Sequence, residues 1–135
     1  MREHISEACA TMQNTNLDWN RRVAALKMLR AVVIGGGMDY SNFSEEMREI
    51  QAALLISVKD LRSQLCREAC VTIAFYCERL GLGMVTAMDT LMPTLILLMQ
   101  NSAKVLFHIS SYKNCNTWHY FNIFRSKCKC QAGMT

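Results

Sequence analysis

The residues best suited to chemistry lie at two polar joints between apolar runs. The first joint, LDWNRR at residues 17–22, carries the indole of Trp19, and the second, SVKDLRSQ at 57–64, carries Lys59 and Arg62. A large aromatic ring can anchor a protein interface. Lys and Arg pair with carboxylates, and the guanidinium can do so with two hydrogen bonds at once. The two joints are either ordinary helix starts or parts of one binding surface, and their placement in the fold must decide between these readings.

No catalytic constellation accompanies these joints. The glycine-rich segment VIGGGMDY follows an apolar helical run and lacks the lysine of a phosphate-binding loop. The sequence also contains no HExxH, GxSxG or paired-carboxylate motif, and His4 and His108 are isolated. We therefore predict a protein that is not an enzyme and that needs no cofactor.

The C-terminal segment contains one candidate metal site. Cys115, His119, Cys128 and Cys130 form a C-x3-H…C-x-C pattern whose ligand types zinc accepts. The C-x-C spacing is tighter than zinc sites usually have, and the set occurs once. We favour scattered cysteines in a poorly ordered tail and predict no metal ligands. The basic, aromatic composition there is also compatible with nucleic acid, but no known module is visible, so we expect no nucleic-acid partner.

Charge and hydropathy narrow the class of protein further. The net charge of +4 equals the four basic residues of the C-terminal segment, Lys113, Arg125, Lys127 and Lys129. The part up to residue 104 is thus neutral, and any basic action there must come from a local cluster. The longest apolar stretch, 84–99, is interrupted by Asp89 and Pro93 and is too short for a membrane span. We expect a cytoplasmic protein with no membrane partner.

Helical periodicity runs through the first 104 residues and determines how the joints are positioned. The expected helices cover Arg2–Gln13, a second run ended by Gly35–Gly37, a third beginning at Ser41 or Ser44, a fourth carrying Leu61, Leu65, Ala69, Ile73 and Leu80, a fifth from about Met84 to Met99 kinked by Pro93, and a sixth beginning near Ser102. Short joints within each pair indicate antiparallel helical hairpins.

The helical pairs recur with a fixed period. Asp18, Asp60 and Ser102, which precede the second helices, are each 42 residues apart. This spacing lies within the roughly 40–47 residues of HEAT or armadillo repeats. We predict an all-α solenoid of about three HEAT-type pairs, at about 2–35, 41–81 and 84–111, with an ordinary six-helix bundle as the alternative. The equivalent joints should lie side by side on one edge.

The composition changes abruptly after Lys104. Residues 105–135 hold more than half of the aromatic residues and no acid. We therefore assign residues 1–104 to the helical domain and 105–135 to a divergent tail. Disorder of that tail is one interpretation, and a changed reading frame from a truncated or unspliced transcript is another.

Three segments carry a family resemblance: LDWNRRVAALKMLRAVV at 17–33, SVKDLRSQLCREACVTIAFY at 57–76 and LMPTLILLMQNSAKV at 91–105. They resemble the N-terminal half of the central TOG domain of the CLASP family, the cytoplasmic linker-associated proteins, from about Glu3 to Val105. Such domains are HEAT-repeat paddles that bind tubulin along the edge formed by the joints within each pair. The family suppresses microtubule shrinkage, also at the spindle and the kinetochore.

The resemblance implies a set of tubulin-binding residues, which are Trp19, Asn20, Arg21, Ser57, Val58, Lys59, Arg62, Asn101 and Lys104. It also implies a microtubule-stabilising function, location on the cytoskeleton, and tubulin or other cytoskeletal proteins as partners. A family domain has about six repeats, and this chain holds about half of them. A HEAT-repeat scaffold that does not bind tubulin, because the domain is truncated, is therefore the alternative function. For single residues, Trp19 could instead cover its helix pair, and Lys59 could simply be solvated. Arg62 or Arg67 could bridge to Asp60, to Glu68 or to a neighbouring repeat.

Overall fold

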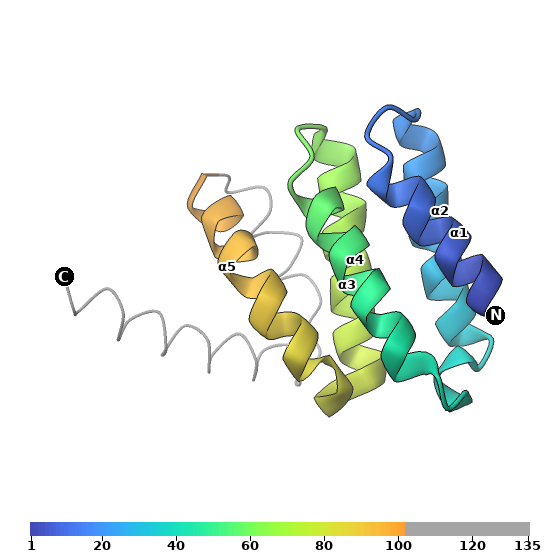
Figure 1. Cartoon of the computed structure of the whole chain (residues 1–135). Coiled ribbons are helices and arrows are strands. Elements are labelled where there is room, and N and C mark those ends of the chain that lie inside the picture. The colour runs from blue at the N-terminus through green and yellow to red at the C-terminus, as the bar shows by residue number, and fades with distance from the viewer. Residues whose placement is uncertain (102–135) are drawn as a thin grey trace, which may run out of the picture.

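The computed structural model describes residues 1–101 of the chain, with side chains up to Leu98. The sixth helix, the metal pattern and the tail that the sequence suggested lie outside the described residues. The described part contains α1 (Arg2–Gln13), α2 (Trp19–Ile34), the 3-10 helix η1 (Gly37–Asp39), α3 (Phe43–Val58), α4 (Ser63–Leu80), the 3-10 helix η2 (Gly81–Met84) and α5 (Val85–Asn101) (Figure 1).

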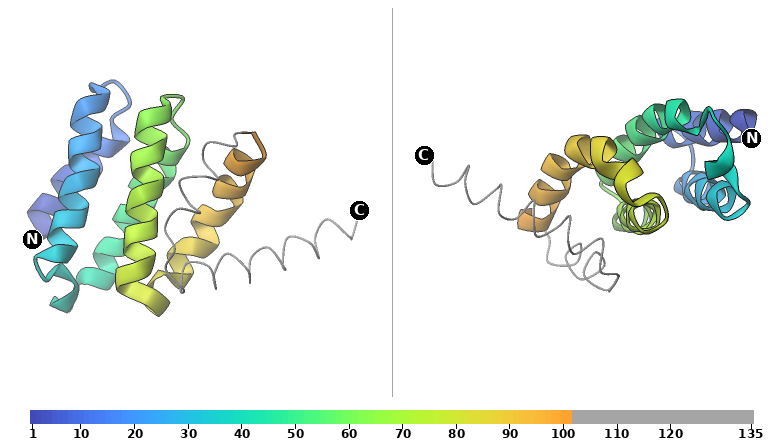
Figure 2. Two further views of the ribbon diagram at one scale, coloured as in Figure 1. Left: turned by 180° about the vertical axis from the view of Figure 1, so that it is seen from behind. Right: turned by 90° about the horizontal axis from the view of Figure 1, so that it is seen from below.

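Successive helices run antiparallel and stack into two layers. Helices α1, α3 and α5 form one layer, and α2 and α4 form the other, as the view along the helices shows (Figure 2). Each of α2 and α4 packs on the helix that precedes it and on its neighbour in its own layer. The prediction of an all-α array of HEAT type is confirmed for two complete pairs and the first helix of a third.

Each helix contributes an apolar stripe to one continuous core. The largest fully buried apolar side chains come from every helix and are Ile5, Met12, Leu26, Leu29, Ile50, Leu54, Val58, Leu65, Tyr76, Met84 and Leu91. Burying one such side chain stabilises the fold by roughly 1.5–3 kcal/mol. The spacing of three or four residues within each stripe is the periodicity that indicated helices.

Polar contacts join the two pairs along the seam between α2 and α4. Arg30 of α2 forms an ion pair with Glu68 of α4 over 3.0 Å. The buried hydroxyl of Tyr76 donates to the carbonyl oxygen of Leu29 over 3.0 Å. Because these groups are paired, the seam does not leave them desolvated without a partner.

The stretch Ser63–Leu98 is apolar enough to match a membrane span by length and hydropathy, with a mean hydropathy of 1.5 in its best window. It folds as two helices, α4 and α5, with η2 between them. Leu65, Tyr76 and Leu91 of this stretch are fully buried in the core. Packing within the helical array accounts for part of this hydropathy, since 33% of that window is buried.

The start of α4 differs from the sequence prediction, which placed Leu61 in its apolar stripe. The helix begins at Ser63, and Leu61 is 101% exposed in the joint before it. The carboxylate of Asp60 accepts a hydrogen bond from the backbone N–H of Arg62 over 2.9 Å. Such local side-chain bonds compete with helix formation, which explains the later start.

Candidate functional site

The joints within the helical pairs lie along one edge of the molecule. In Figure 1 the α1–α2 joint (residues 14–18) and the α3–α4 joint (59–62) stand next to each other, and α5 ends at the same edge. The α2–α3 and α4–α5 connections lie at the opposite edge. The expectation that the equivalent joints are neighbours therefore agrees with the structure. We call residues 14–21 and 59–64 the joint edge.

The first turn of α2, directly after the first joint, carries three of the residues predicted from the sequence to bind tubulin. Trp19 opens α2 and is partly buried against the core, so it both covers the helix pair and retains some exposed surface. Asn20 and Arg21 are exposed. Asn20 donates to the Asp18 carboxylate over 3.3 Å, which orders the first turn.

The second joint presents two exposed cations around an exposed leucine. Lys59 follows the end of α3, and Arg62 directly precedes α4. Both side chains are exposed, and Leu61 stands between them. Sequence reasoning missed Leu61 because its spacing to Leu65 also fits a helical stripe. The combination offers an apolar contact flanked by positive charge.

Two of the proposed contact residues belong to the core instead. Ser57 and Val58 are both 0% exposed, and the Ser57 hydroxyl donates to the carbonyl oxygen of Ala53 over 3.0 Å. They occupy the last turn of α3, directly before the joint itself. Their side chains present no exposed surface, and their role as tubulin contacts stays a prediction.

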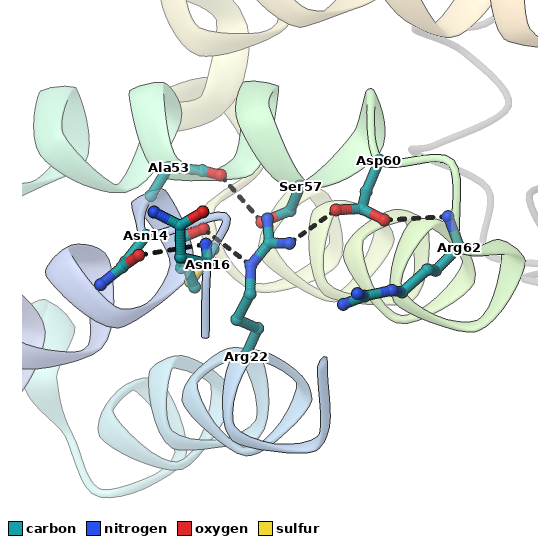
Figure 3. Close-up of polar contacts among 8 residues, drawn as sticks. Asn14, Asn16, Arg22, Ala53, Ser57, Asp60 and Arg62 are labelled. Atoms are coloured by element: carbon teal, nitrogen blue, oxygen red, sulfur yellow. Dashed lines mark hydrogen bonds and ion pairs between the residues drawn. The ribbon is translucent and has the colours of Figure 1, made fainter. Parts of the chain in front are cut away.

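The edge is built on an ion pair that sequence reasoning also missed (Figure 3). Arg22 is 0% exposed, and its Nη1 lies 2.6 Å from Oδ2 of Asp60, linking α2 to the α3–α4 joint. Its Nε donates to the carbonyl oxygen of Met12 at the end of α1 over 3.1 Å. A buried guanidinium needs such partners to be tolerated. In the sequence, the sign of this ion pair is an arginine among the apolar positions of α2.

The Asp60 carboxyl titrates in an unusual environment. Partial burial by itself raises its pKa, but hydrogen bonds from the Arg62 backbone and the Arg22 side chain, with the charges of both arginines, hold the pKa below its ordinary value of 3.8. The carboxylate is therefore held in its charged form. The side-chain ion pair of this carboxylate is with Arg22, and the charge of Arg62 also acts on it.

The internal ion pairs leave the edge cations available. Asp60 is engaged by Arg22, and Glu68 by Arg30, so neither carboxylate forms a side-chain ion pair with Arg62 or Arg67. Among the described residues, Lys59, Arg62 and Arg21 form no ion pair. The alternative that Arg62 serves as a structural bridge is thus not what the structure shows. Of the remaining named residues, Asn101 ends α5 and its side chain is not described, and Lys104 lies outside the described residues.

Other reactive groups in the described part are structural. Cys9, Cys66, Cys70 and Cys77 are free and buried. A hydrogen bond with Cys70 lowers the pKa of Cys66 to about 7, whereas burial raises the pKa of Cys9 and of Cys77 to about 12. No cluster of three or more metal-ligating side chains occurs within residues 1–101.

One hollow of about 260 Å³ lies at the N-terminal end of α1, beside the start of α3. Its lining includes Tyr40 and the side chain of Glu46. Arg2 forms an ion pair with this nearly buried carboxylate over 3.3 Å. The carboxylate in the lining of the hollow is therefore already engaged by Arg2.

Comparisons with known proteins agree with this architecture. The family model described as "CLASP N terminal" matches residues 1–123, which extends beyond Val105. CLIP-associating protein 1-A of Xenopus laevis is 34% identical over 106 residues, which are 78% of this chain and 7% of that protein. CLIP-associating protein of Drosophila melanogaster is 33% identical over 113 residues, or 82% of this chain and 8% of that protein.

Protein CLASP-1 of Caenorhabditis elegans is 32% identical over 108 residues, which are 78% of this chain. The chain therefore spans less than a tenth of the length of these relatives. The family model covers most of the chain, and the helical array fits a TOG-like domain. By these matches, the chain belongs to the CLASP N-terminal domain family.

Proposed function

We propose that this chain is a non-enzymatic tubulin-binding module of a microtubule-stabilising protein, and that the joint edge is its contact surface. The observation that carries the proposal is the division of charge at this edge. Asp60 neutralises Arg22 internally, while Lys59 and Arg62 stay exposed and without an ion pair in the described part. Tubulin is acidic, so exposed cations on one edge match its surface.

The proposed contacts combine charge with apolar area. Trp19, Asn20 and Arg21 supply the first joint, and Lys59, Leu61 and Arg62 supply the second. The cations would steer the encounter and make binding sensitive to salt, while Trp19 and Leu61 would bury apolar surface. Asn101 and Lys104 remain proposed contacts of the third joint. The corresponding cellular location is the microtubule cytoskeleton, including the spindle and kinetochore.

Co-sedimentation of the purified chain with microtubules, and binding to free tubulin, test this proposal at low and moderate salt. A variant with Lys59→Ala and Arg62→Ala is compared with a variant with Lys27→Ala and Arg48→Ala. All four residues are exposed, so both variants lose the same charge with little effect on the core. We expect weaker binding only for the edge variant.

Two results would count against the proposal. Equal weakening by both variants would indicate non-specific charge attraction. No binding by the wild-type chain at low salt would favour the other candidate function, a HEAT-type scaffold for a different protein, in which the truncated domain does not bind tubulin.

A further inference from the structure

The buried guanidinium of Arg22 contacts both the end of α1 and the α3–α4 joint. It projects from the first turn of α2, three residues after Trp19. Its Nε donates to Met12 at the end of α1 over 3.1 Å, and its Nη1 reaches Asp60 in the α3–α4 joint over 2.6 Å. One side chain therefore ties the first joint to the second (Figure 3).

Asp60 passes this constraint on to the exposed residues of the second joint. One carboxylate oxygen, Oδ2, is held by Arg22, and the other, Oδ1, accepts the backbone N–H of Arg62 over 2.9 Å. Both oxygens are thus engaged across the turn that carries Leu61. The leucine points into solvent although its two neighbours are fixed. A tripeptide turn held at both ends has little freedom to lose on binding.

We infer that Arg22 and Asp60 are positioning residues that clamp the two joints into one preorganised contact surface. The inference rests on the proposed function, because it assigns these residues to the same surface without placing them in contact with the partner. Arg22 is fully buried, and only 15% of the Asp60 side chain is exposed. Their contribution to binding is therefore indirect, through the placement of Leu61 and Arg62 relative to Trp19.

A second ion pair provides a matched control. Arg30 and Glu68 also join α2 to α4, over 3.0 Å. Arg30 follows Arg22 by eight residues and Glu68 follows Asp60 by eight, so this pair lies away from the joints. Their side chains are 17% and 24% exposed. Removing this pair loosens the same helix seam without touching the clamp, so it separates a general loss of packing from a loss of edge geometry.

The test measures amide hydrogen exchange and tubulin binding for the whole chain. The variants are Arg22→Met, Asp60→Ala, Asp60→Asn and the control Arg30→Met, each at a temperature where circular dichroism shows it folded. We expect exchange at the Arg62 amide to accelerate about tenfold in Asp60→Ala, and less in Asp60→Asn, whose amide oxygen can still accept the Arg62 N–H. Arg30→Met should leave this amide unchanged.

Binding is then compared under the same conditions. We expect Asp60→Ala and Arg22→Met to weaken tubulin binding about tenfold, with partial recovery in Asp60→Asn and little change in Arg30→Met. Unchanged exchange at Arg62 would overturn the clamp, and so would equal weakening of binding by Arg30→Met. If Arg22→Met does not fold, the two Asp60 variants decide the question. Absence of wild-type binding overturns the proposed function, and the exchange rates alone then decide whether the clamp exists.

Discussion

Replacement of Asp60 by asparagine isolates the charge of the buried ion pair. Asparagine keeps the shape of the side chain and an acceptor for the Arg62 N–H, but it leaves the Arg22 guanidinium, which is 0% exposed, without a counter-charge. Breaking a buried pair in this way costs about 3–5 kcal/mol. Because 15% of the Asp60 side chain reaches solvent, we expect the lower end, about 3 kcal/mol.

The loss should depend on pH in a defined direction. The pKa of Asp60 is lower in the folded chain than its ordinary value of 3.8, so its stabilising effect is fully present above that value. The effect disappears as the pH falls through the folded pKa, where the carboxyl takes up its proton. The difference in unfolding free energy between wild type and Asp60→Asn should therefore be large at pH 7 and shrink below about pH 3.8.

Urea unfolding followed by circular dichroism measures this difference at several pH values. A double-mutant cycle with Arg22→Met should give a coupling energy of about 2 kcal/mol at pH 7. Loss of other carboxylate interactions, such as that of Glu46 with Arg2, affects both proteins equally and cancels. A difference below about 1 kcal/mol at pH 7, or one that grows in acid, would refute the assignment of Asp60 as the counter-ion of Arg22.

Three other predictions concern the edge, a turn and the thiols. Leu61→Ser should weaken tubulin binding in co-sedimentation, while Leu82→Ser, at a leucine 84% exposed on the opposite edge, should not; equal effects would argue against the joint edge. Gly36 has φ 88°, so Gly36→Ala should destabilise the chain by about 1 kcal/mol in urea unfolding, whereas Gly35→Ala, where no positive φ occurs, should cost less. Iodoacetamide labelling at pH 7, read by peptide mass spectrometry, should modify Cys66 before Cys9 and Cys77. The reason is that the pKa of Cys66 is lowered to about 7, whereas burial raises the pKa of the other two thiols to about 12. Labelling in the reverse order would contradict these environments.

The helical architecture could be predicted from the sequence because it depends on local patterns of residue type and spacing. Apolar residues three or four apart define the stripes, and Gly35–Gly37 follow the end of α2 as expected. The repeat period placed the two joints on one edge, since consecutive helical pairs repeat the same geometry. Trp19, Lys59 and Arg62 follow from this placement, together with the family resemblance.

The structure adds to or differs from the sequence predictions where tertiary contacts decide between equally good local patterns. Leu61 fits the helical spacing of α4, but the Asp60 carboxylate captures the Arg62 N–H and delays the helix. Ser57 and Val58 border the joint in sequence, yet they belong to the last buried turn of α3. The pairing of Arg22 with Asp60 joins residues of different repeats, and periodicity within one chain segment contains no information about such a partner.

The most direct test of the central claim is site-specific photo-crosslinking. A photoreactive amino acid replaces Leu61 in one variant and Leu82 in another. Both positions tolerate the replacement because both leucines are exposed, one at each edge of the array. After irradiation with tubulin, we predict a tubulin adduct from position 61 and none from position 82. An adduct from position 82 alone, or equal adducts from both, would show that the joint edge is not the tubulin-binding surface.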